Sequence, residues 1–521
     1  NYYKSIGYYD VQIVSSNAEI SNDNITTLTY NINAGTRYRV NKITTNVNEV
    51  LDKKLFFPLE KDFKKIIGKY YSPFKIKKLL DELDNIIVEN DLQFVEHSVN
   101  EIIENEFIEV KINIYEGSKQ LVEKINVKGN SITNESVIRS ELILDEGDPF
   151  NFLKLEKSIS NLKARNIFAD VKKEVKDGSI KDQKVIEIKV EEKPTGEISA
   201  GAGVGTNGGS FAFDVSENNY LGKGLRVSTN VEVNQSTLKG SLNVIDPNYN
   251  YTGNSLRYSL SRTTNDKAES GYENELIETS VGTSFEQYRN IFVIPSLSFS
   301  YDDLKVQDNA SDALKKQKGA FSDLALDYAI QFDSRDRSFM PTDGYVSTFN
   351  QVFPLYADSP YLKNTYSLNK YHSFGPNVIG AFKFFGSAIN GVGGDDVRLS
   401  KRITVSTNRL RGFQSGKIGP VDGNDYIGGN YATVANIEAN LPNILPEFTK
   451  TDIGLFLDIG NLWGVDYSSS ADDGYKIRAS TGINTSWTSP IGPMTFVFSQ
   501  NLSAKGTDKT ESFNFKLGTS F

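Results

Sequence analysis

Histidine and cysteine, which often act in catalysis or bind metals, are scarce or absent in this chain, and the histidines are not spaced to act together. Its 521 residues include two histidines, His97 and His372, and no cysteine. The histidines do not form a pair with zinc-ligand spacing, and the sequence contains neither a nucleophile elbow nor a phosphate-binding glycine loop. A hydrolase that uses His372 stays a formal alternative. The sequence therefore predicts a protein without a metal, without a cofactor and without bond-making activity.

Two acidic turns, at 393–396 and 422–425, resemble calcium-binding loops in composition only. Neither turn has the twelve-residue spacing or the closing glutamate of such a loop. Gly, Asn and Asp also favour tight turns because of their backbone freedom and their short side chains. We interpret both segments as turns.

Two carboxylates interrupt segments that otherwise alternate like β-strands. Every second residue of 453–459 is apolar and Asp458 falls between them, and Glu438 has the same position in 435–439. Because successive side chains of a strand point to opposite faces, both carboxylates lie on the face that is not apolar. In a narrow interior such a carboxylate requires a cation as its partner. The alternative is that both are simply solvated.

The second part of the chain, residues 196–521, reads as a series of amphipathic strands. Every second residue is apolar in 225–233, apart from Thr229, and in 238–244 and 256–260, and turn residues separate these segments. The final segment, 512–521, alternates in the same way and ends on an aromatic residue. Segments of about ten residues with one apolar face are typical of a transmembrane β-barrel, and the length allows about sixteen strands. A soluble β-sandwich or propeller is the alternative.

The first part of the chain contains a repeat of about 80 residues. Similar strand endings occur at 28–35, 110–117 and 185–192, and each follows a shorter predicted strand, at 8–13, 94–99 and 168–173. The predicted unit is strand, helix, helix, strand, strand. We expect the end of one such domain at 1–36, complete domains at 37–117 and 118–195, and the barrel at 196–521.

Two helices are predicted in the unit that precedes the barrel. One begins near Ser131, and the other spans 150–164, where Leu155, Ile159 and Leu162 form an apolar stripe. Asp148 and Pro149 are expected to provide the cap and first turn of the second helix.

Charge and hydropathy exclude several classes of protein. The formal net charge is −9 and no long basic run occurs, which argues against nucleic acid as a partner. No apolar run approaches the ~20 residues that a membrane-spanning helix needs. The first residues read as the middle of a domain, so we expect an export signal before residue 1.

Together these features resemble the BamA family of outer-membrane β-barrel assembly proteins, and the repeats resemble POTRA domains. The similarity covers essentially the whole chain. Its motifs are Arg411-Gly412-Phe413 with 414–420, Phe456-x-Asp458-x-Gly460, Asp333-x-Arg335 with 336–344, and Arg478-x-Ser480-x-Gly482 with 487–493.

The resemblance implies α+β periplasmic repeats followed by an all-β, antiparallel transmembrane barrel in the outer membrane. It implies that Arg411, Gly412 and Phe413 anchor a loop inside the lumen against Glu438 and Asp458. The implied partners are unfolded outer-membrane proteins, periplasmic lipoprotein subunits of an assembly complex, periplasmic chaperones and the lipid bilayer. A polypeptide translocase of the same superfamily (TamA-like or two-partner secretion) and a porin-like channel are the alternatives.

The two ends of the barrel sequence predict a weak lateral seam. Glycine supplies no side chain for packing, so Gly201, Gly203 and Gly205 leave one face of the first strand bare. The last strand carries Phe513, Phe515 and Phe521. Our hypothesis is that this seam opens and that its free edge pairs with a client strand. Each repeat should also offer an exposed edge strand, which we expect around Val185–Val190.

Overall fold

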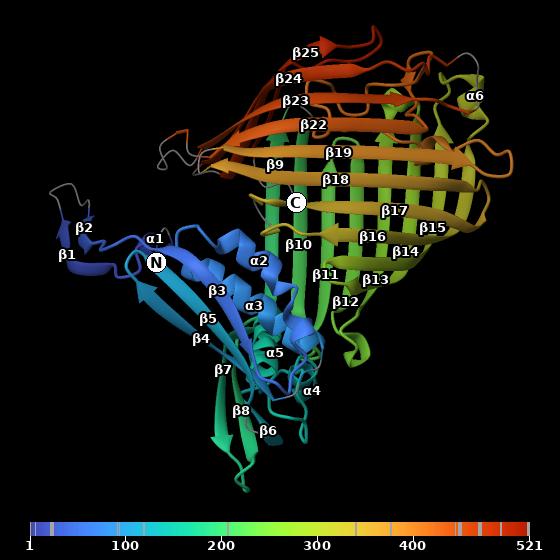
Figure 1. Ribbon diagram of the computed structural model, residues 1–521. Coiled ribbons are helices and arrows are strands. Elements are labelled where there is room, and N and C mark those ends of the chain that lie inside the picture. Colours follow the sequence, from blue (N-terminus) through green and yellow to red (C-terminus); the bar gives the residue numbers. More distant parts are fainter. Residues whose placement is uncertain are drawn as a thin grey trace. The chain divides into compact units, whose positions relative to one another are not determined.

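The computed structural model in Figure 1 contains two compact units, Asn1–Lys193 and Pro194–Phe521, and each is described here by itself. The structure describes residues 2–5, 7–20, 26–90, 92, 94–117, 120–205, 208–338, 341–375, 378–442, 444–445, 451–466, 471–489 and 492–517. Phe521, one of the predicted seam residues, lies outside the described residues. Within these ranges, none of the helices combines the length and the apolar character that crossing a membrane would require.

The first unit contains two complete βααββ repeats after a short leading segment. The leading segment holds α1 (Tyr2–Ser5), β1 (Gln12–Ile20) and β2 (Thr26–Asn33). The first repeat holds β3 (Arg39–Val47), the 3₁₀ turn η1 (Lys53–Phe56), α2 (Leu59–Ile66), α3 (Pro73–Glu89), β4 (Val95–Glu104) and β5 (Phe107–Glu116). The second holds β6 (Leu121–Lys128), α4 (Glu135–Arg139), α5 (Phe152–Ala164), β7 (Phe168–Asp177) and β8 (Gln183–Glu192). The predicted order of elements is confirmed.

In each repeat the last strand lies in the middle of a three-stranded sheet. The strand orders are β3-β5-β4 and β6-β8-β7, with the first and last strands parallel and the second and last antiparallel. Ile186, Ile188 and Val190 of β8 are buried in one cluster with Leu155, Ile159 and Leu162 of α5. The prediction of an exposed edge around Val185–Val190 is therefore wrong, because the two helices carry the chain across the sheet and leave a central gap that β8 fills. The edge strands of this sheet are β6 and β7.

Helix α5 forms where the apolar stripe predicts it, but its cap differs from the prediction. Leu155, Ile159 and Leu162 are buried against the sheet. The side chain of Asn151 accepts hydrogen bonds from the backbone N–H groups of Leu153 and Lys154, at 2.9 and 3.1 Å. Asn151 is thus the N-cap. Asp148 and Pro149 lie before the helix, where Pro149 bridges to β6 through Leu121.

The second unit is a closed barrel of sixteen antiparallel strands, which confirms the predicted barrel architecture and the strand number. Its strands are β9 (Gly196–Gly205), β10 (Gly208–Tyr220), β11 (Leu225–Asn234), β12 (Thr237–Asp246), β13 (Ser255–Lys267), β14 (Tyr272–Tyr288), β15 (Ile291–Val306), β16 (Gly319–Asp333), β17 (Gly344–Ala357), β18 (Tyr361–Gly375), β19 (Val378–Gly391), β22 (Tyr431–Leu441), β23 (Thr451–Trp463), β24 (Arg478–Ser489), β25 (Gly492–Ser503) and β26 (Phe513–Leu517). Figure 1 shows them side by side around the barrel.

The outer face of the barrel is apolar along its strands. Val231 and Val233 of β11, Leu260 of β13 and Ile437 of β22 are exposed, as expected for side chains that meet a bilayer. The polar residues between them point inward. This alternation explains why a chain with a mean hydropathy of −0.39 can form a membrane barrel.

The longest connections lie at one end of the barrel. We call this the distal end, and the end at which β9 begins the proximal end. The connection between β19 and β22, residues 392–430, is here called the lumen loop; it holds η4 (Leu399–Lys401), β20 (Val421–Asp422) and β21 (Asp425–Tyr426). Other short elements in the connections are η2 (Tyr249–Tyr251), η3 (Ala268–Ser270) and α6 (Asp312–Lys315).

Candidate functional site

Arg411 of the lumen loop is bound by two carboxylates of the barrel wall. Its backbone N–H and its Nε donate to Asp458 Oδ2, at 2.9 and 2.8 Å. Its Nη2 donates to Asp458 Oδ1 at 2.7 Å and to Glu438 Oε1 at 2.8 Å. The guanidinium also lies over the ring of Phe456, 3.8 Å from its centroid. This is the bidentate geometry that a guanidinium provides and that an ammonium group cannot.

Both carboxylates have further partners. Asn436 donates to Asp458 Oδ1 at 2.7 Å, and Lys383 Nζ lies 2.7 Å from Glu438 Oε2. Asp458 has no exposed surface. The alternative of two freely solvated lumen carboxylates therefore does not describe this arrangement. A buried carboxylate with cationic and amide donors on both oxygens is the arrangement that low-dielectric surroundings favour.

The position after Arg411 favours glycine. Gly412 has φ = +87°, and a Cβ there would lie 2.7 Å from Asn501 Oδ1 and 3.1 Å from Ser480 Cβ. Both neighbours are bonded to the loop: Asn501 donates to the carbonyl of Gly412 at 3.0 Å, and the Ser480 hydroxyl donates to the carbonyl of Arg411. The backbone conformation is one that glycine adopts readily and that strains other residues, and a Cβ there would also displace the side chain of Asn501.

Phe413 completes the anchor by burial rather than by polar contact. It is 1% exposed and lies in an apolar cluster inside the barrel. The other members of that cluster are Ile389, Val397, Ile403, Val405, Leu410, Ile418, Ala432, Val434 and Leu462. Loop and wall both contribute, so the lumen loop has a hydrophobic core of its own with the strands that face it.

The same stretch of loop pairs with the chain that leads into the last strand. Gln414 N donates to the Lys509 carbonyl and Lys509 N to the Lys417 carbonyl, both at 3.0 Å, and Glu511 N donates to the Gly412 carbonyl at 2.9 Å. The loop that carries Arg411 thus lies directly against the segment that precedes β26.

The two ends of the barrel sequence meet over a very short register. Among the described residues, β26 pairs with β9 through Lys516↔Gly205 and Leu517↔Val204 only, the shortest pairing in the barrel. The register of β26 with β25, by contrast, covers the whole of β26. Cross-strand pairs are the unit of sheet stability, so the described part of this junction contributes least to closure.

The predicted seam residues are placed on both sides of this junction. Gly201 and Gly203 lie in β9, and a Cβ on Gly203 would approach the Leu517 carbonyl to 3.1 Å. In β26, Phe513 packs on Phe498 of β25 at 5.0 Å between centroids and on Phe515 at 6.0 Å. The aromatic side chains therefore hold β26 to β25, while β9 offers β26 little besides backbone.

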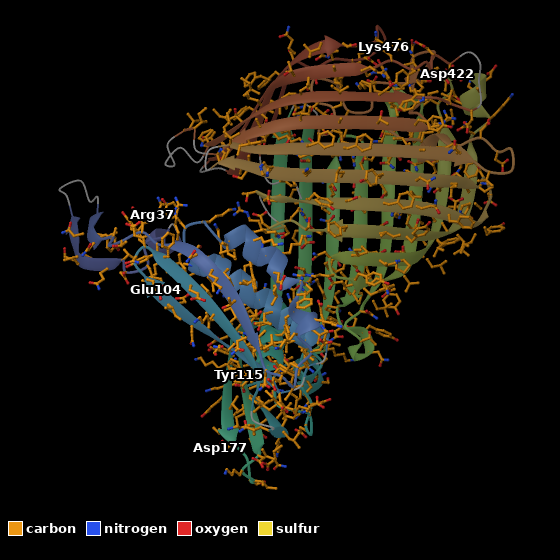
Figure 2. The ribbon with its side chains drawn as sticks, viewed as in Figure 1. Arg37, Glu104, Tyr115, Asp177, Asp422 and Lys476 are labelled. Carbon is orange, nitrogen blue, oxygen red and sulfur yellow. The ribbon has the colours of Figure 1, made fainter. Side chains whose placement is uncertain are left out.

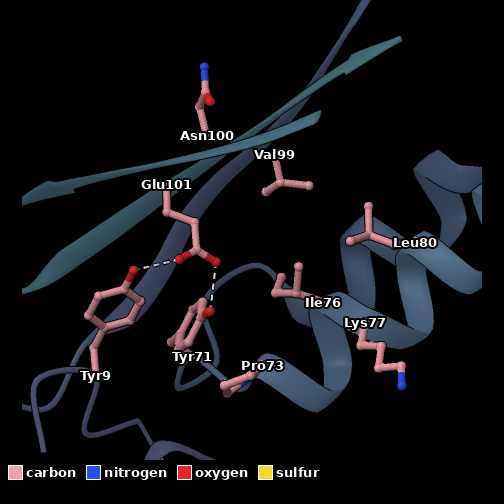
Figure 3. A pocket seen from close by; sticks show the side chains of 9 residues that line it. All are labelled: Tyr9, Tyr71, Pro73, Ile76, Lys77, Leu80, Val99, Asn100 and Glu101. Carbon is pink, nitrogen blue, oxygen red and sulfur yellow. Dashed lines mark hydrogen bonds between the residues drawn. The ribbon is translucent and has the colours of Figure 1, made fainter. Parts of the chain in front are cut away.

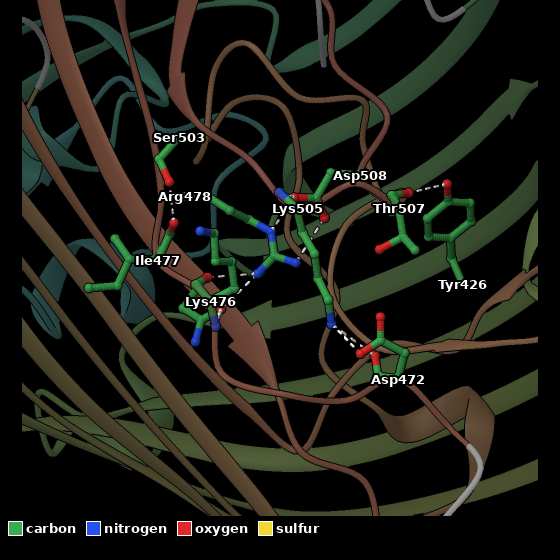
Figure 4. Close-up of polar contacts among 10 residues, drawn as sticks. Tyr426, Asp472, Lys476, Ile477, Arg478, Ser503, Lys505, Thr507 and Asp508 are labelled. Carbon is green, nitrogen blue, oxygen red and sulfur yellow. Dashed lines mark hydrogen bonds and ion pairs between the residues drawn. The ribbon is translucent and has the colours of Figure 1, made fainter.

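One buried ion pair was not singled out from the sequence. Figure 4 shows Arg478, at the start of β24, donating from Nε and Nη2 to both carboxylate oxygens of Asp508, each at 2.8 Å. Nη1 donates to Asn461 Oδ1 at 2.7 Å and to the Lys476 carbonyl at 3.0 Å. Arg478 belongs to a motif of the resemblance, but Asp508 lies in a connection where strand periodicity gives no signal.

The acidic turn at 422–425 is the tip of the β20–β21 hairpin. Its Gly423 has φ = +63°, and Asp422, labelled in Figure 2, accepts a hydrogen bond from the Ser311 hydroxyl at 2.6 Å. Of the histidines, His372 on β18 lies 3.1 Å from Asp343 and is largely exposed, whereas His97 on β4 lies 2.6 Å from Asp84 of α3. The two histidines thus lie in different units, each beside one carboxylate.

The first repeat has a groove between α3 and its edge strand β4. Its volume is about 610 Å³, and its lining includes Ile76, Leu80 and Val99. At one end, shown in Figure 3, Glu101 accepts hydrogen bonds from the hydroxyls of Tyr9 and Tyr71, at 2.7 and 2.6 Å. The hydrogen bond to Glu101 is the main cause that raises the pKa of Tyr9 to about 12. This contact fixes the leading segment against the first repeat.

Family models match both units of the chain. The Omp85 superfamily domain matches residues 219–521, and POTRA, described as a surface antigen variable number repeat, matches residues 120–193.

Relatives and solved structures agree with these family matches. An outer membrane protein assembly factor BamA of Neorickettsia risticii is 26% identical over 80% of this chain and 57% of its own length. That of Neisseria meningitidis serogroup B is 25% identical over all of this chain and 72% of its own length. The chain thus spans little more than half of the first relative. The crystal structure of Haemophilus ducreyi BamA lacking POTRA domains 1–3 has a TM-score of 0.67 at 21% identity, and the match covers 93% of this chain and 100% of that one. The last likeness shows the fold.

Proposed function

Because the chain belongs to the Omp85 superfamily, we propose that it folds other β-barrel proteins and inserts them into the outer membrane. Its barrel lies in that membrane, and its POTRA repeats lie in the periplasm. The proximal end of the barrel is therefore periplasmic and the distal end is extracellular. Unfolded barrel proteins are the proposed clients, and periplasmic lipoproteins and chaperones are the proposed partners.

The short junction between β9 and β26 is the observation that carries this proposal. Among the described residues two residue pairs close this edge, so freeing that part of it costs little, and a freed edge presents unpaired N–H and C=O groups to any strand that arrives. Main-chain hydrogen bonds supply the affinity in such strand addition, so one edge can serve clients of many sequences. A protein that handles many different barrels requires this loose selectivity.

The Arg411 anchor supports the proposal from inside the lumen. The loop that it fixes is bonded to the chain before β26, and Lys516 Nζ of β26 donates to Asn408 Oδ1 of the same loop at 3.0 Å. In this role Arg411, Gly412 and Phe413 hold the last strand in place, and Glu438 and Asp458 are their wall partners. When the junction opens, β26 then stays with β25 and the loop.

A disulfide across the junction tests the proposal. Val204 and Leu517 face each other in the register, and the chain has no cysteine of its own, so Val204→Cys with Leu517→Cys introduces a single possible bond. Closing this bond should abolish insertion of client barrels into proteoliposomes, and reduction should restore it. Insertion at the normal rate by the fully oxidised protein would show that the junction does not open.

A matched control locks β9 to its other neighbour. Ile198 and Val215 face each other between β9 and β10, and both are exposed on the outer face. Ile198→Cys with Val215→Cys should leave insertion unchanged in both redox states. Depletion of the protein in its source cells then separates the functions: loss of many outer-membrane barrels indicates an assembly factor, whereas loss of one secreted polypeptide indicates a transporter.

The repeats offer a second place for client strands. In the first repeat, β4 is an edge strand with the groove beside it, so an added strand would place alternate side chains against Val99 and Leu80. In the second repeat, the edge strand β7 carries Lys172 and Lys176, both exposed. Lysines on an edge oppose strand addition. We therefore assign client or partner binding to β4 rather than to β7.

A further inference from the structure

Three polar side chains form a hydrogen-bonded chain across β16, β17 and β18, which lie side by side in Figure 1. The Tyr328 hydroxyl donates to Gln351 Oε1 at 2.7 Å, and Gln351 Nε2 donates to Asn364 Oδ1 at 2.5 Å. The register places Tyr328 opposite Gln351 and Gln351 opposite Asn364. Residues that are opposite each other in neighbouring strands point to the same side of the sheet, so all three lie on one face of the wall. We call them the polar row.

The polar row lies on the outer face of the barrel. On β16, Leu326 and Ile330 share a face with Tyr328 and are exposed. On β17, Phe353 shares a face with Gln351 and is also exposed. Exposed apolar side chains of a barrel strand meet the bilayer, so the row faces lipid.

The opposite face of the same wall is the lumen face. There Asp323 of β16 pairs with Arg398 of the lumen loop, and Asp302 of β15 accepts a hydrogen bond from the Ser400 hydroxyl at 2.5 Å. Asp323 and Tyr328 are separated by an odd number of positions along β16, so they point to opposite faces. The polar row therefore takes no part in binding the lumen loop.

Gln351 lies at the depth of the lipid tails. Tyr345 and Tyr356 are exposed near the two ends of β17, where barrels place aromatic side chains at the membrane interfaces, and Gln351 lies between them. A carboxamide offers two N–H groups and two lone pairs. The row uses one N–H of Gln351, and Asn364 enters it only as an acceptor. Lipid tails supply neither donors nor acceptors, so carboxamides at this depth favour contact with another protein.

Small residues lie beside the polar row on the next strand. In the register of β18 with β19, Asn364 is opposite Ala388 and Tyr366 is opposite Gly386. Glycine and alanine at a surface inside the membrane allow the backbone of another chain to approach closely, and polar side chains then bond across the contact. The outer face of β17–β19 combines both features.

We propose that the polar row is the contact through which two copies of this chain associate side by side in the outer membrane. Two copies in one membrane have the same orientation and the same depth, so a two-fold axis along the membrane normal brings each row against its counterpart. Carboxamides donate and accept, so Gln351 and Asn364 of one copy bond with the same residues of the other. A row of one charge would instead repel itself.

The position of the polar row leaves the junction of β9 with β26 free. Seven barrel strands, β9 to β15, lie between that junction and β16, and seven barrel strands from β18 to β26 lie on the other side of β17. The row is thus on the side of the barrel opposite the junction. Both copies keep their junctions facing lipid, so association is independent of the proposed insertion of clients.

Thiol crosslinking of the full chain in native outer membranes tests the proposal, because the chain has no cysteine. Phe353→Cys places a thiol beside Gln351 and keeps the row intact, whereas Val231→Cys places one on the outer face of β11. A short bifunctional thiol reagent should join two chains through Phe353→Cys and not through Val231→Cys. Adding Gln351→Leu with Asn364→Leu should lower the crosslinked fraction about tenfold, since hydrogen bonds between the chains are lost from both copies.

Thr229→Val is the matched control, because it removes a polar group from the outer face of β11, away from the row. Combined with Phe353→Cys, it should leave the crosslinked fraction unchanged. Equal crosslinking through Phe353→Cys and Val231→Cys would overturn the proposal, as would a dimer that persists undiminished without the two carboxamides. An adduct of Phe353→Cys with a different membrane protein, in place of a second copy, would reject the assignment of the partner. Insertion of clients by the Gln351→Leu, Asn364→Leu protein should be unchanged, which separates this proposal from the proposed function.

Discussion

Arg478 and Asp508 form a bidentate ion pair in which neither side chain has any exposed surface. Asp508 also accepts a hydrogen bond from the backbone N–H of Lys505 at 2.6 Å. The pair ties the first residue of β24 to the connection 504–512, which leads into β26. This ion pair thus positions the last strand through the connection that precedes it, and the lumen loop positions the strand from inside the barrel.

Loss of Asp508 should destabilise the barrel. Asp508→Ala leaves the Arg478 guanidinium buried without its counter-charge, which costs about 3–5 kcal/mol. Unfolding in urea, followed through Trp463 and Trp487, should show this loss. The control Lys505→Ala breaks the partly exposed pair with Asp472 of the same region and should cost less than about 1 kcal/mol. Equal effects of the two variants would mean that burial of the pair does not set its contribution.

Arg411 should behave as one unit with its two carboxylates. Arg411→Ala removes Nε and Nη2, the two guanidinium nitrogens that donate to Asp458. This loss should lower the free energy of unfolding by about 3–5 kcal/mol and impair the insertion of clients. Arg411→Lys should restore only part of this, because an ammonium group cannot bond both oxygens in the same plane.

A double-mutant cycle tests the coupling directly. Asp458→Asn and Glu438→Gln should each weaken the anchor, and each should be non-additive with Arg411→Ala. The free energy of unfolding of the single and double variants provides the cycle. Strict additivity would show that these contacts make no joint contribution to stability.

The stability of the second repeat should depend on the ionisation of Glu192. Burial raises the pKa of this carboxyl, but donors from Thr133, Ser131 and Ile132 outweigh the burial and lower it from 4.5 to about 2. The closest of these is the N–H of Thr133, at 2.6 Å. Because the folded pKa lies below the unfolded one, the stabilisation is complete above about pH 4.5 and is lost as the pH falls towards 2.

Glu192→Gln provides the test of this pH dependence. At neutral pH the variant should unfold at lower urea than the parent, as followed by far-UV circular dichroism. The difference should shrink as the pH falls and should vanish near pH 2, where the parent carboxyl is itself protonated. A difference that stays constant over this range would mean that the charge of Glu192 is not involved.

Edge strand β4 should contact clients more than edge strand β7. A photo-crosslinking amino acid at Asn100 of β4 should capture an unfolded barrel protein, and one at Lys172 of β7 should capture little. Both positions are exposed on edge strands, so they are matched for accessibility. Equal capture at the two positions would remove the assignment to β4.

Strand periodicity predicted that Glu438 and Asp458 point into the barrel. The apolar residues on either side of each carboxylate take the outer face, so the carboxylate takes the inner one. Ile437 and Ile459 are exposed outside the barrel, and Glu438 and Asp458 accordingly point inward. The same alternation in β15 puts Phe299 and Tyr301 outside and Asp302 inside, so Asp302 could have been found in the same way. Arg411 itself came from the resemblance, since a loop residue has no periodicity from which its contacts follow.

Other features depend on pairing between segments far apart in the sequence. Alternation in 185–190 shows that one face of the strand is buried, but it cannot show whether the strand has one neighbour or two. Asp508 and Arg398 lie in connections, so only the folded barrel reveals their partners. At α5, both Asp148-Pro149 and Asn151 are good cap signals, and the bridge of Pro149 to Leu121 decides between them.

The short register of β26 and β9 has a consequence for how the barrel itself comes to be folded. Arg411 and Asp458 are 47 residues apart in the sequence, and Arg478 and Asp508 are 30 residues apart. The pairing of Leu517 with Val204, however, joins opposite ends of the barrel sequence, and over the described residues it forms few hydrogen bonds to offset the chain entropy that it costs. The C-terminal third, with its docked loop, is therefore expected to act as the folding nucleus, and ring closure is expected to be the last and most reversible step.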